Sequence, residues 1–386
     1  MDTTSPTLTD AMFLTHLEGQ NLRNLEPFQL DFRASLNLIV GENAQGKTNL
    51  LEAIYLATAL KAFRASRNRE LIRWDARDAS LRANLRMRLG MRALEVKLGE
   101  KSRRVKVDGK SVQSLEEFAS AVKVVLFTPE DLSMIRGAPA LRRSFLDRAI
   151  YHLYPRHAEM VRDYTQVITQ KNKLLSQGET SSLLLSVWDE RQVELGSRVM
   201  VARSRFAQRI QPLFAENFRE ISGTGITARL LWRPSHATLE GLEGPELRRA
   251  FAQTLEQHAD EERRRGQCVV GPHRDELEVT LDGHDAATYG SQGQARMLAL
   301  CLKIVELRVL LEDRGIVPLF LLDDVSSELD SVRNRYLMAY LSRVGCQVFV
   351  TTTATQHVPT EGFDQVDVFR VIAGNVQRDP SVFNTG

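Results

Sequence analysis

Cysteine and long apolar runs are scarce in this sequence, and each shortage excludes a class of protein. The 386 residues include three cysteines, which are odd in number and widely spaced among apolar neighbours. We therefore expect reduced core thiols, with no disulfide framework and no metal site built on them. No apolar run approaches membrane-spanning length, and the first residues lack the basic and apolar regions of a signal peptide. These absences predict a cytoplasmic protein with no membrane partner.

Acidic and basic residues are nearly balanced over the whole chain but not within it. The net charge is +2. Residues 61–110 hold 16 lysines and arginines against 6 acidic residues, whereas residues 266–386 hold 10 against 16. The first segment should attract polyanions such as nucleic acids, and the last should repel them. A chain of 386 residues also exceeds one ordinary core, so we expect two or three domains.

The most informative stretch is Gly41-Glu-Asn-Ala-Gln-Gly-Lys47-Thr48, which has the G-x-x-x-x-G-K-[S/T] spacing of a phosphate-binding loop. It follows the apolar run Leu36–Val40, which predicts a buried strand, and precedes residues 49–60, whose apolar positions recur at helical spacing. Backbone N–H groups and the helix N-terminus would bind phosphate oxygens. Lys47 would reach the β- and γ-phosphates of ATP, and the Thr48 hydroxyl would be a ligand of Mg²⁺.

A second apolar run, Val317–Leu322, ends in two carboxylates, Asp323 and Asp324. Asp323 is the natural partner of the phosphate loop and would orient Mg²⁺ opposite Thr48. Asp324 occupies the position of a carboxylate that polarises the attacking water. Two acidic residues after a strand can also form a simple helix-capping turn, but a phosphate loop in the same chain favours catalytic roles for Lys47, Asp323 and Asp324.

Three consecutive basic segments, residues 61–69, 81–89 and 101–110, follow the first predicted helix. Residues 81–89 alternate between apolar residues and mostly arginines, as in a half-buried strand. Such a row of arginines would suit a DNA backbone, with salt-sensitive binding. Residues 101–110 predict a similar strand, with its basic groups outward, that ends in an Asp108-Gly109 hairpin turn. Charged rows are usually solvated faces, so both interpretations stay open; the candidate DNA-binding residues are Arg64, Arg82, Arg86, Arg88, Arg103 and Arg104.

The distribution of predicted strands and helices divides the chain into three parts. Residues 11–130 contain predicted strands, the phosphate loop and the basic segments. A polar turn in this part contains Arg23 and Asn24, which would either contact the nucleotide or lie in solvent. Residues 131–265 consist mainly of long amphipathic patterns and predict a helical arm. In the last part, residues 266–386, the expected strands are 267–270, 277–282, 317–322 and 347–353.

Together these features resemble the head of an ABC-type ATPase of the SMC-related branch. In this resemblance Gly290–Gln294 corresponds to the signature loop and Ser327–Asp330 to the D-loop. Within that branch the chain is similar to the RecF family of bacterial recombination mediators over nearly its whole length. The similarity is carried by the phosphate loop near residue 40 and by Ala62–Arg64, Phe127–Leu132, Arg142–Asp147, Gly271–Asp275 and Tyr289–Gln294.

The resemblance implies an α/β fold, namely a P-loop ABC/SMC-type ATPase head of two lobes with an inserted, mainly helical arm domain. Such heads dimerise around two ATP molecules, so that the phosphate loop of one subunit faces the signature loop of the other. The implied metal ligands of Mg²⁺ are Thr48 and Asp323. The implied nucleotide-binding residues are Gly41, Glu42, Asn43, Ala44, Gln45, Gly46, Lys47, Thr48, Asn49, Ser291, Gln292, Gly293, Gln294 and Asp330.

The function that the resemblance implies is an ATP-dependent DNA clamp of recombinational repair. It would bind single- and double-stranded DNA at gaps or junctions, dimerise on ATP, hydrolyse ATP slowly and help to load recombinase, with RecO-, RecR- and RecA-type partners. Two alternatives from other classes are the ATPase subunit of a membrane transporter and an ATP-binding structural scaffold. The basic residues 61–110, the altered signature loop and the long helical insertion argue against the transporter subunit.

Three departures from the ABC pattern limit what the resemblance implies. Asp324 stands where many ABC ATPases have glutamate, which is consistent with slow turnover. Thr351–Thr353 follows the last strand where many transporters have a switch histidine. Either the Thr352 or Thr353 hydroxyl would sense the γ-phosphate, or the sensing would be weak. No glutamine is identified as the Q-loop residue.

Overall fold

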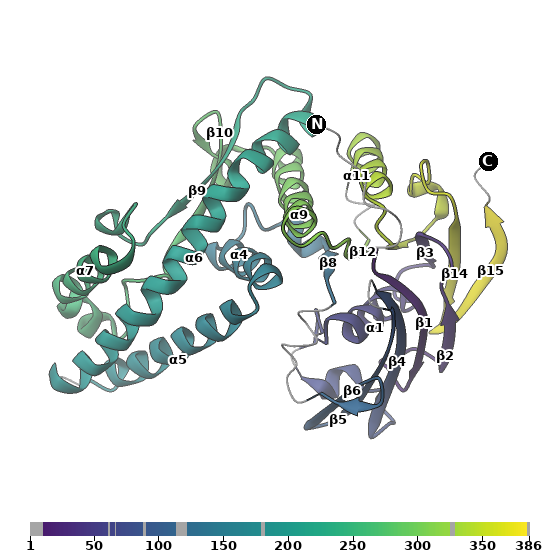
Figure 1. Cartoon of the computed structure of the whole chain (residues 1–386), viewed down its shortest axis with the longest axis horizontal. Coiled ribbons are helices and arrows are strands. Elements are labelled where there is room, and N and C mark those ends of the chain that lie inside the picture. Colours follow the sequence, from purple (N-terminus) through teal and green to yellow (C-terminus); the bar gives the residue numbers. More distant parts are fainter. Residues whose placement is uncertain are drawn as a thin grey trace. The chain divides into compact units, whose positions relative to one another are not determined.

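The computed structural model describes residues 11–60, 62–65, 67–87, 90–112, 122–178, 182–324 and 329–383. The chain forms two compact units (Figure 1). The first, called here the discontinuous unit, combines Met1–Asp131 with Glu306–Gly386. The second, the inserted unit, is Leu132–Val305. An α/β head interrupted by an inserted, mainly helical segment is therefore the observed architecture.

A mainly parallel sheet forms one layer of the discontinuous unit. Its strand order is β15-β14-β3-β13-β12-β8, and only β15 runs antiparallel to its neighbour. Every residue of β3, β8, β12 and β13 is buried, as expected for parallel strands covered on both faces. The strands are β3 (Leu36–Val40), β8 (Val124–Phe127), β12 (Leu319–Leu322), β13 (Val348–Thr352), β14 (Val366–Ile372) and β15 (Asn375–Phe383).

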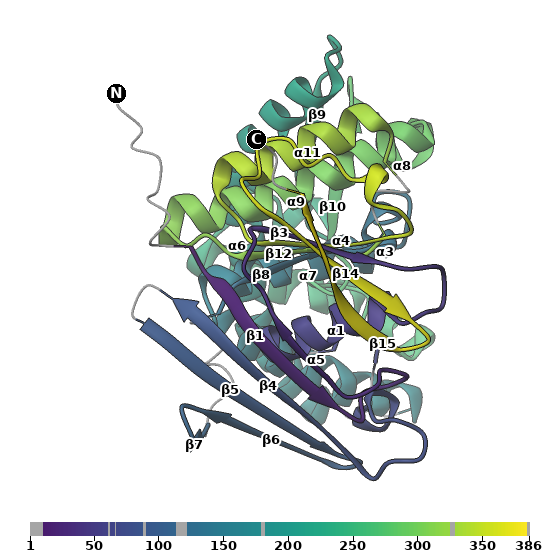
Figure 2. The same ribbon diagram turned by 90° about the vertical axis from the view of Figure 1, so that its right-hand side faces the viewer.

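An antiparallel sheet forms the second layer of this unit, with the order β2-β1-β4-β5-β6-β7 (Figure 2). In β4 the apolar residues Ala79, Leu81, Ala83 and Leu85 are buried and the residues between them face outward, which confirms the predicted alternation in the described part of this segment. Asp108 and Gly109 both have positive φ, 51° and 77°, as in the tight hairpin turn predicted there. The strands are β1 (Phe13–Gln20), β2 (Phe28–Asp31), β4 (Asp78–Met87), β5 (Gly90–Gly99), β6 (Ser102–Val107) and β7 (Lys110–Ser111).

Helix α1 (Lys47–Ala59) packs against strands of both sheets. Its buried residues are spread around the helix, as expected for a helix that is covered on more than one side. One hydrophobic core therefore joins α1 to the two sheets and holds the start of α1 in a fixed position. The remaining elements of this unit are η2 (Asn68–Leu71), α11 (Ser331–Val344) and η4 (Thr355–His357), while α3 (Pro129–Leu132) lies at the boundary.

The inserted unit is built on long helices and a small antiparallel sheet, β11-β10-β9. It continues past residue 265, where the arm is predicted to end, because β9 pairs with β10 over six residue pairs. Its helices are α4 (Pro139–Leu153), α5 (Arg156–Ser176), α6 (Ser182–Ser222), η3 (Ala237–Leu239), α7 (Gly244–Arg265) and α8 (Ala286–Tyr289). Its strands are β9 (Ala228–Arg233), β10 (Glu276–Leu281) and β11 (His284–Asp285), and α9 (Gln292–Arg314) begins in it.

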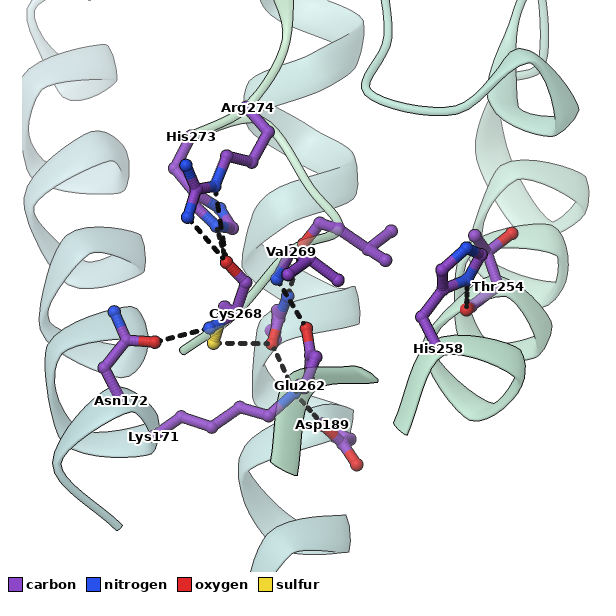
Figure 3. Close-up of polar contacts among 12 residues, drawn as sticks. Lys171, Asn172, Asp189, Thr254, His258, Glu262, Cys268, Val269, His273 and Arg274 are labelled. Carbon is purple, nitrogen blue, oxygen red and sulfur yellow. Dashed lines mark hydrogen bonds and ion pairs between the residues drawn. The ribbon is translucent and has the colours of Figure 1, made fainter. Parts of the chain in front are cut away.

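The strand predicted at residues 267–270 is wrong. The backbone N–H groups of Cys268 and Val269 are bonded by side chains of α5 and α7 and not by a neighbouring strand (Figure 3). Cys268 N donates to Asn172 Oδ1 at 2.6 Å, and Val269 N donates to Glu262 Oε1 at 2.9 Å. Glu262 also accepts from the Lys171 ammonium at 2.6 Å, so the apolar segment is fixed by a buried ion pair.

Candidate nucleotide-binding site and basic face

The phosphate loop connects β3 to α1, and two of its glycines are required by the backbone. A side chain at Gly41 would place its Cβ 2.4 Å from the carbonyl oxygen of Val371, and Gly46 has a φ of 114°. The turn between β14 and β15 supports the loop from outside. Gly374 N donates to the Gln45 carbonyl at 3.0 Å, and Ala373 N donates to the Gln45 side chain.

Lys47 lies inside the loop and is buried. Its ammonium donates to the carbonyl oxygens of Gly41 and Glu42 at 2.7 and 2.8 Å. Burial lowers the pKa of Lys47, and the nearby carboxylates of Asp324 and Asp323 partly offset this effect. The ammonium therefore lies within the loop, where it can contact the phosphate oxygens of a bound nucleotide.

Asp323 and Thr48 meet although they come from opposite ends of the chain. Asp323 Oδ1 accepts from the Thr48 hydroxyl at 2.8 Å and from the Thr351 hydroxyl at 3.0 Å. The Asp323 side chain is 1% exposed, and burial raises its pKa, against the opposing effect of its hydrogen-bond and charge partners. A hydroxyl and a buried carboxylate are hard oxygen donors of the kind that Mg²⁺ takes, so the pair fits the predicted metal ligands.

Asp324 follows in an unusual backbone conformation, with a φ of 52°. Its N–H donates to Thr351 Oγ1 at 2.7 Å, so Thr351 holds both carboxylate residues at the ends of β12 and β13. The Thr352 hydroxyl donates to the Ala354 carbonyl at 3.0 Å, and Thr353 lies 3.5 Å from a ring nitrogen of His357. Thr351 is therefore the threonine that contacts the two acids, and the sequence interpretation had assigned it no role.

Arg64 also contacts this site. Its guanidinium donates to Asp323 Oδ2 at 3.0 Å, and its backbone N–H donates to Glu52 Oε1 at 3.1 Å. Glu52, buried on α1, is in turn paired with Arg23. Asn24 accepts from the side chain of Asn49 at 2.7 Å. The structure thus brings Arg64, Arg23 and Asn24 to the phosphate loop region, and Glu52 is a member that sequence reasoning missed.

The predicted signature loop lies in the inserted unit and forms the start of α9. Ser291 N donates to Gln294 Oε1 at 2.7 Å, and Gln294 N donates to Ser291 Oγ at 3.1 Å. This reciprocal pair is a capping box, which fixes the first turn of the helix. Ser291 and Gln292 are exposed, and Gly293 is half-buried. These side chains are thus presented at a helix N-terminus, the kind of end that favours an anion.

The predicted D-loop falls mostly outside the described residues, because residues 325–328 are not described. Asp330 is described, and it caps α11 by accepting from the N–H groups of Val332 and Arg333 at 3.1 and 3.0 Å.

The outer face of the antiparallel sheet carries acids as well as arginines. Arg82 lies between Glu18 of β1 and Glu95 of β5, at 3.7 and 3.6 Å. Arg86 lies over the ring of Phe13, with 4.8 Å between guanidinium carbon and ring centroid. Both arginines remain on the outward side of β4, as predicted, but Arg82 is already balanced by two carboxylates. Arg88 lies outside the described residues.

The predicted outward orientation of the basic groups on β6 is correct for Arg104 and wrong for Arg103. Arg104 is exposed and pairs across strands with Lys97. Arg103 pairs with the buried Leu98, so its side chain points to the inner side of the sheet. There its guanidinium donates to the Leu60 carbonyl at 2.7 Å and to Asn68 Oδ1 at 2.9 Å. Arg103 therefore ties β6 to the end of α1.

The sequence matches a family model and several RecF proteins over most of its length. The family model described as RecF/RecN/SMC N terminal domain matches residues 13–374. A protein of Geotalea uraniireducens (strain Rf4), described as DNA replication and repair protein RecF, is 38% identical over 92% of this chain and 97% of its own length. The chain belongs to the RecF family. A RecF of Myxococcus xanthus (strain DK1622) is 40% identical over 89% of this chain and 91% of its own length.

Solved structures of RecF agree with this fold. The structure of the recombination mediator protein RecF with ATP, in the RecFOR pathway, matches with a TM-score of 0.86 and 30% identity over 98% of this chain and all of the other chain. An Smc head domain of Pyrococcus furiosus matches with a TM-score of 0.57 at 15% identity, over 97% of this chain and 96% of its own, and supports the fold alone. Among the residues that the structure describes, no helix combines the length and apolarity needed to cross a membrane.

Proposed function

We propose that this RecF-family chain is an ATP-dependent DNA clamp of recombinational repair and replication-fork maintenance, and that it acts in the cytoplasm. The observation that carries the proposal is the contact of Thr48 with Asp323 beside the buried Lys47 ammonium. It joins the two halves of a nucleotide site within a family whose solved members include RecF with ATP.

The residues of this site would have separate roles in binding phosphate, holding Mg²⁺ and orienting water. Lys47 and the loop N–H groups bind the phosphates, while Thr48 and Asp323 hold Mg²⁺. Asp324 orients the attacking water. When bound, Mg²⁺-ATP supplies a γ-phosphate that a second subunit can contact and a bond that can be hydrolysed.

Dimerisation is the proposed output of nucleotide binding. The exposed Ser291 and the capped N-terminus of α9 would contact the γ-phosphate from the second subunit of a homodimer. Loss of that phosphate on slow hydrolysis removes the contact, so the dimer opens. Closed dimers would hold single- or double-stranded DNA at gaps and junctions and help recombinase loading with RecO-, RecR- and RecA-type partners.

One residue favours a second candidate, an ATP-binding scaffold without useful hydrolysis. The side chain of Asp324 is one methylene shorter than the glutamate common at this position, and it would place water less well. ATP binding and phosphate release by the purified chain, with and without DNA, separate the two functions. The clamp requires nucleotide binding and slow phosphate release; nucleotide binding with no release supports the scaffold, and no nucleotide binding contradicts both.

A further inference from the structure

Trp74 is the most exposed large hydrophobic side chain among the described residues, at 92%. It lies on the turn Arg73–Arg77, called here the Trp74 turn, which connects η2 to β4. A tryptophan side chain normally loses most of its water contact in a folded protein. Its exposure here leaves both faces of a large aromatic ring open to a ligand.

The exposure of Trp74 does not arise from a loose turn. The Arg69 guanidinium donates to three carbonyl oxygens of the turn, those of Arg73, Trp74 and Ala76, at 3.1, 2.8 and 3.1 Å. Ala76 N also donates to the Arg73 carbonyl at 3.1 Å. The backbone that carries the indole is therefore fixed, so a ligand that stacks on the ring does not have to order the turn.

The Trp74 turn shares its support with the phosphate loop. Arg73 N donates to the Asn21 carbonyl at 2.8 Å, and the Arg73 guanidinium donates to the Leu25 carbonyl. The same segment, residues 21–25, reaches the phosphate loop, because a Cβ on Gly46 would lie 3.0 Å from Asn24 Oδ1. Trp74 is thus anchored within the unit that holds the candidate nucleotide site.

The neighbours of Trp74 in the chain are charged and not apolar. Asp75, Arg77 and Asp78 are exposed, as is Arg67 at the start of η2. An aromatic anchor of a protein interface sits in a well-packed apolar centre from which water is excluded. A nucleobase needs only an aromatic face. Arg67 and Arg77 can contact backbone phosphates, while the two aspartates balance their charge, so the exposed ring is the feature that favours a base.

We propose that Trp74 is a stacking platform for a nucleobase. The inference rests on the proposed function, and the base has two sources of the same chemistry: a nucleotide of single-stranded DNA or the adenine of ATP. The π-face contact is the same in both cases, and every base offers it.

The test uses the fluorescence of Trp74 in the full chain. Trp74, Trp188 and Trp232 are the three tryptophans, so the W188F/W232F variant retains Trp74 alone. This variant is titrated with a dT oligomer and, separately, with a non-hydrolysable ATP analogue, while fluorescence anisotropy of a labelled ligand reports binding. Quenching of Trp74 by the oligomer assigns a DNA base, and quenching by the analogue alone assigns adenine.

Substitutions of Trp74 in a chain that retains Trp188 and Trp232 provide a second measurement, the Kd of the ligand. Trp74→Ala should raise the Kd for the quenching ligand between about 5-fold and about 100-fold, since one base stacked on an aromatic side chain contributes about 1–3 kcal/mol. Trp74→Phe, which keeps an aromatic face, should restore most of the affinity. Leu183→Ala removes another exposed apolar side chain, 79% exposed on α6, and should change nothing.

The outcomes separate this inference from the proposed function. Ligand binding without any change in Trp74 fluorescence, together with an unchanged Kd for Trp74→Ala, overturns the stacking proposal and leaves the clamp intact. Binding of neither DNA nor nucleotide overturns both. Loss of a protein partner in Trp74→Ala with unchanged nucleic-acid and nucleotide affinity assigns the indole to a protein interface and also overturns the stacking proposal.

Discussion

The Thr48 hydroxyl lies 2.8 Å from Asp323 Oδ1, although the two residues are 275 positions apart. If this pair holds Mg²⁺, Thr48→Ala should weaken Mg²⁺-dependent nucleotide binding by about 10- to 100-fold, the range found when groups around a metal are removed. Thr48→Ser retains the hydroxyl and should stay close to the parent. Titration of a fluorescent ATP analogue in Mg²⁺ and in EDTA measures the difference. Equal Mg²⁺ dependence in the parent and Thr48→Ala would contradict the metal role.

Lys47→Met tests the phosphate contact. The side chain is buried against the carbonyls of Gly41 and Glu42, so methionine of similar length fills the space while removing the charge. ATP-dependent dimerisation should be abolished, as measured by light scattering at saturating ATP. Circular dichroism of the variant controls for folding. A folded Lys47→Met chain that still dimerises with ATP would show that the lysine is not needed for phosphate binding.

Asp324→Asn tests the catalytic acid. The amide keeps the shape of the side chain and removes the charge that would polarise water, so the variant should bind ATP, stop releasing phosphate and accumulate as the dimer. Light scattering and a phosphate-release assay on the same sample measure both effects. A variant that stays monomeric at saturating ATP would count against the role given to Asp324.

The arginines at positions 82, 86 and 88 predict a salt dependence of DNA binding. Replacing Arg82, Arg86 and Arg88 together by alanine should reduce the slope of log K against log salt by up to about 0.9 for each DNA phosphate that is no longer neutralised. Arg82→Ala alone should have little effect, because Glu18 and Glu95 already balance its charge. Anisotropy of a labelled duplex at several salt concentrations gives the slopes. Unchanged affinity and slope in the triple variant would place the DNA site elsewhere.

Arg103→Ala serves as the matched control for that series. It also removes one arginine, but its guanidinium is bonded to Leu60 and Asn68. It should lower stability by about 1–3 kcal/mol, because hydrogen bonds to a charged group are removed, while leaving the salt slope unchanged. A reduced slope with unchanged stability would mean that Arg103 contacts DNA.

The half-buried His273 and the buried Asp275 of the inserted unit predict opposing effects of pH on stability. Burial lowers the pKa of His273 from 6.5 to about 4, so the stability from its neutral ring is lost as pH falls from 6.5 toward 4. Burial raises the pKa of Asp275 from 3.8 to about 6, so its contribution is present below 3.8 and is lost as pH rises through 6. The two dependences largely cancel in the parent chain.

Asp275→Asn removes the opposing carboxyl, so the loss of stability on protonation of His273 should become measurable. The variant should be more stable than the parent near pH 7, and its urea midpoint should fall more steeply on acidification between pH 6.5 and 4. Asp75→Asn, at an exposed position, should follow the parent. Parallel pH profiles for Asp275→Asn and the parent would show that Asp275 does not titrate in this range.

Local patterns predicted most of the fold. Continuous apolar runs located the buried strands that end at the phosphate loop and at Asp323, and period-two alternation oriented β4 correctly. Both signals depend on neighbouring residues alone. The motif itself paired Asp323 with Thr48, since a carboxylate after a buried strand is the usual partner of a phosphate loop. The structure supplies the physical reason, because β3, β13 and β12 are parallel neighbours and present their carboxyl ends at the same edge of the sheet.

Contacts between distant side chains could not be read in this way. The segment at Cys268 looks like a strand, yet its N–H groups are satisfied by Asn172 and Glu262. Arg103 and Arg104 are adjacent strand residues, so they point to opposite faces, and the pairing of β6 with β5 decides that Arg103 is the one that points inward. Thr351 gains its place only because β13 lies beside β12. In each case the deciding contact is made by a residue on another element, which a local pattern does not specify.

In the proposed clamp, nucleotide state, dimerisation and DNA binding belong to one mechanism. The most direct test is binding of the full chain to a short labelled duplex at fixed moderate salt with no nucleotide, ADP or ATP, recording stoichiometry as well as affinity. The clamp predicts tighter binding with ATP and two chains in each complex. Absence of duplex binding in every nucleotide state would contradict it.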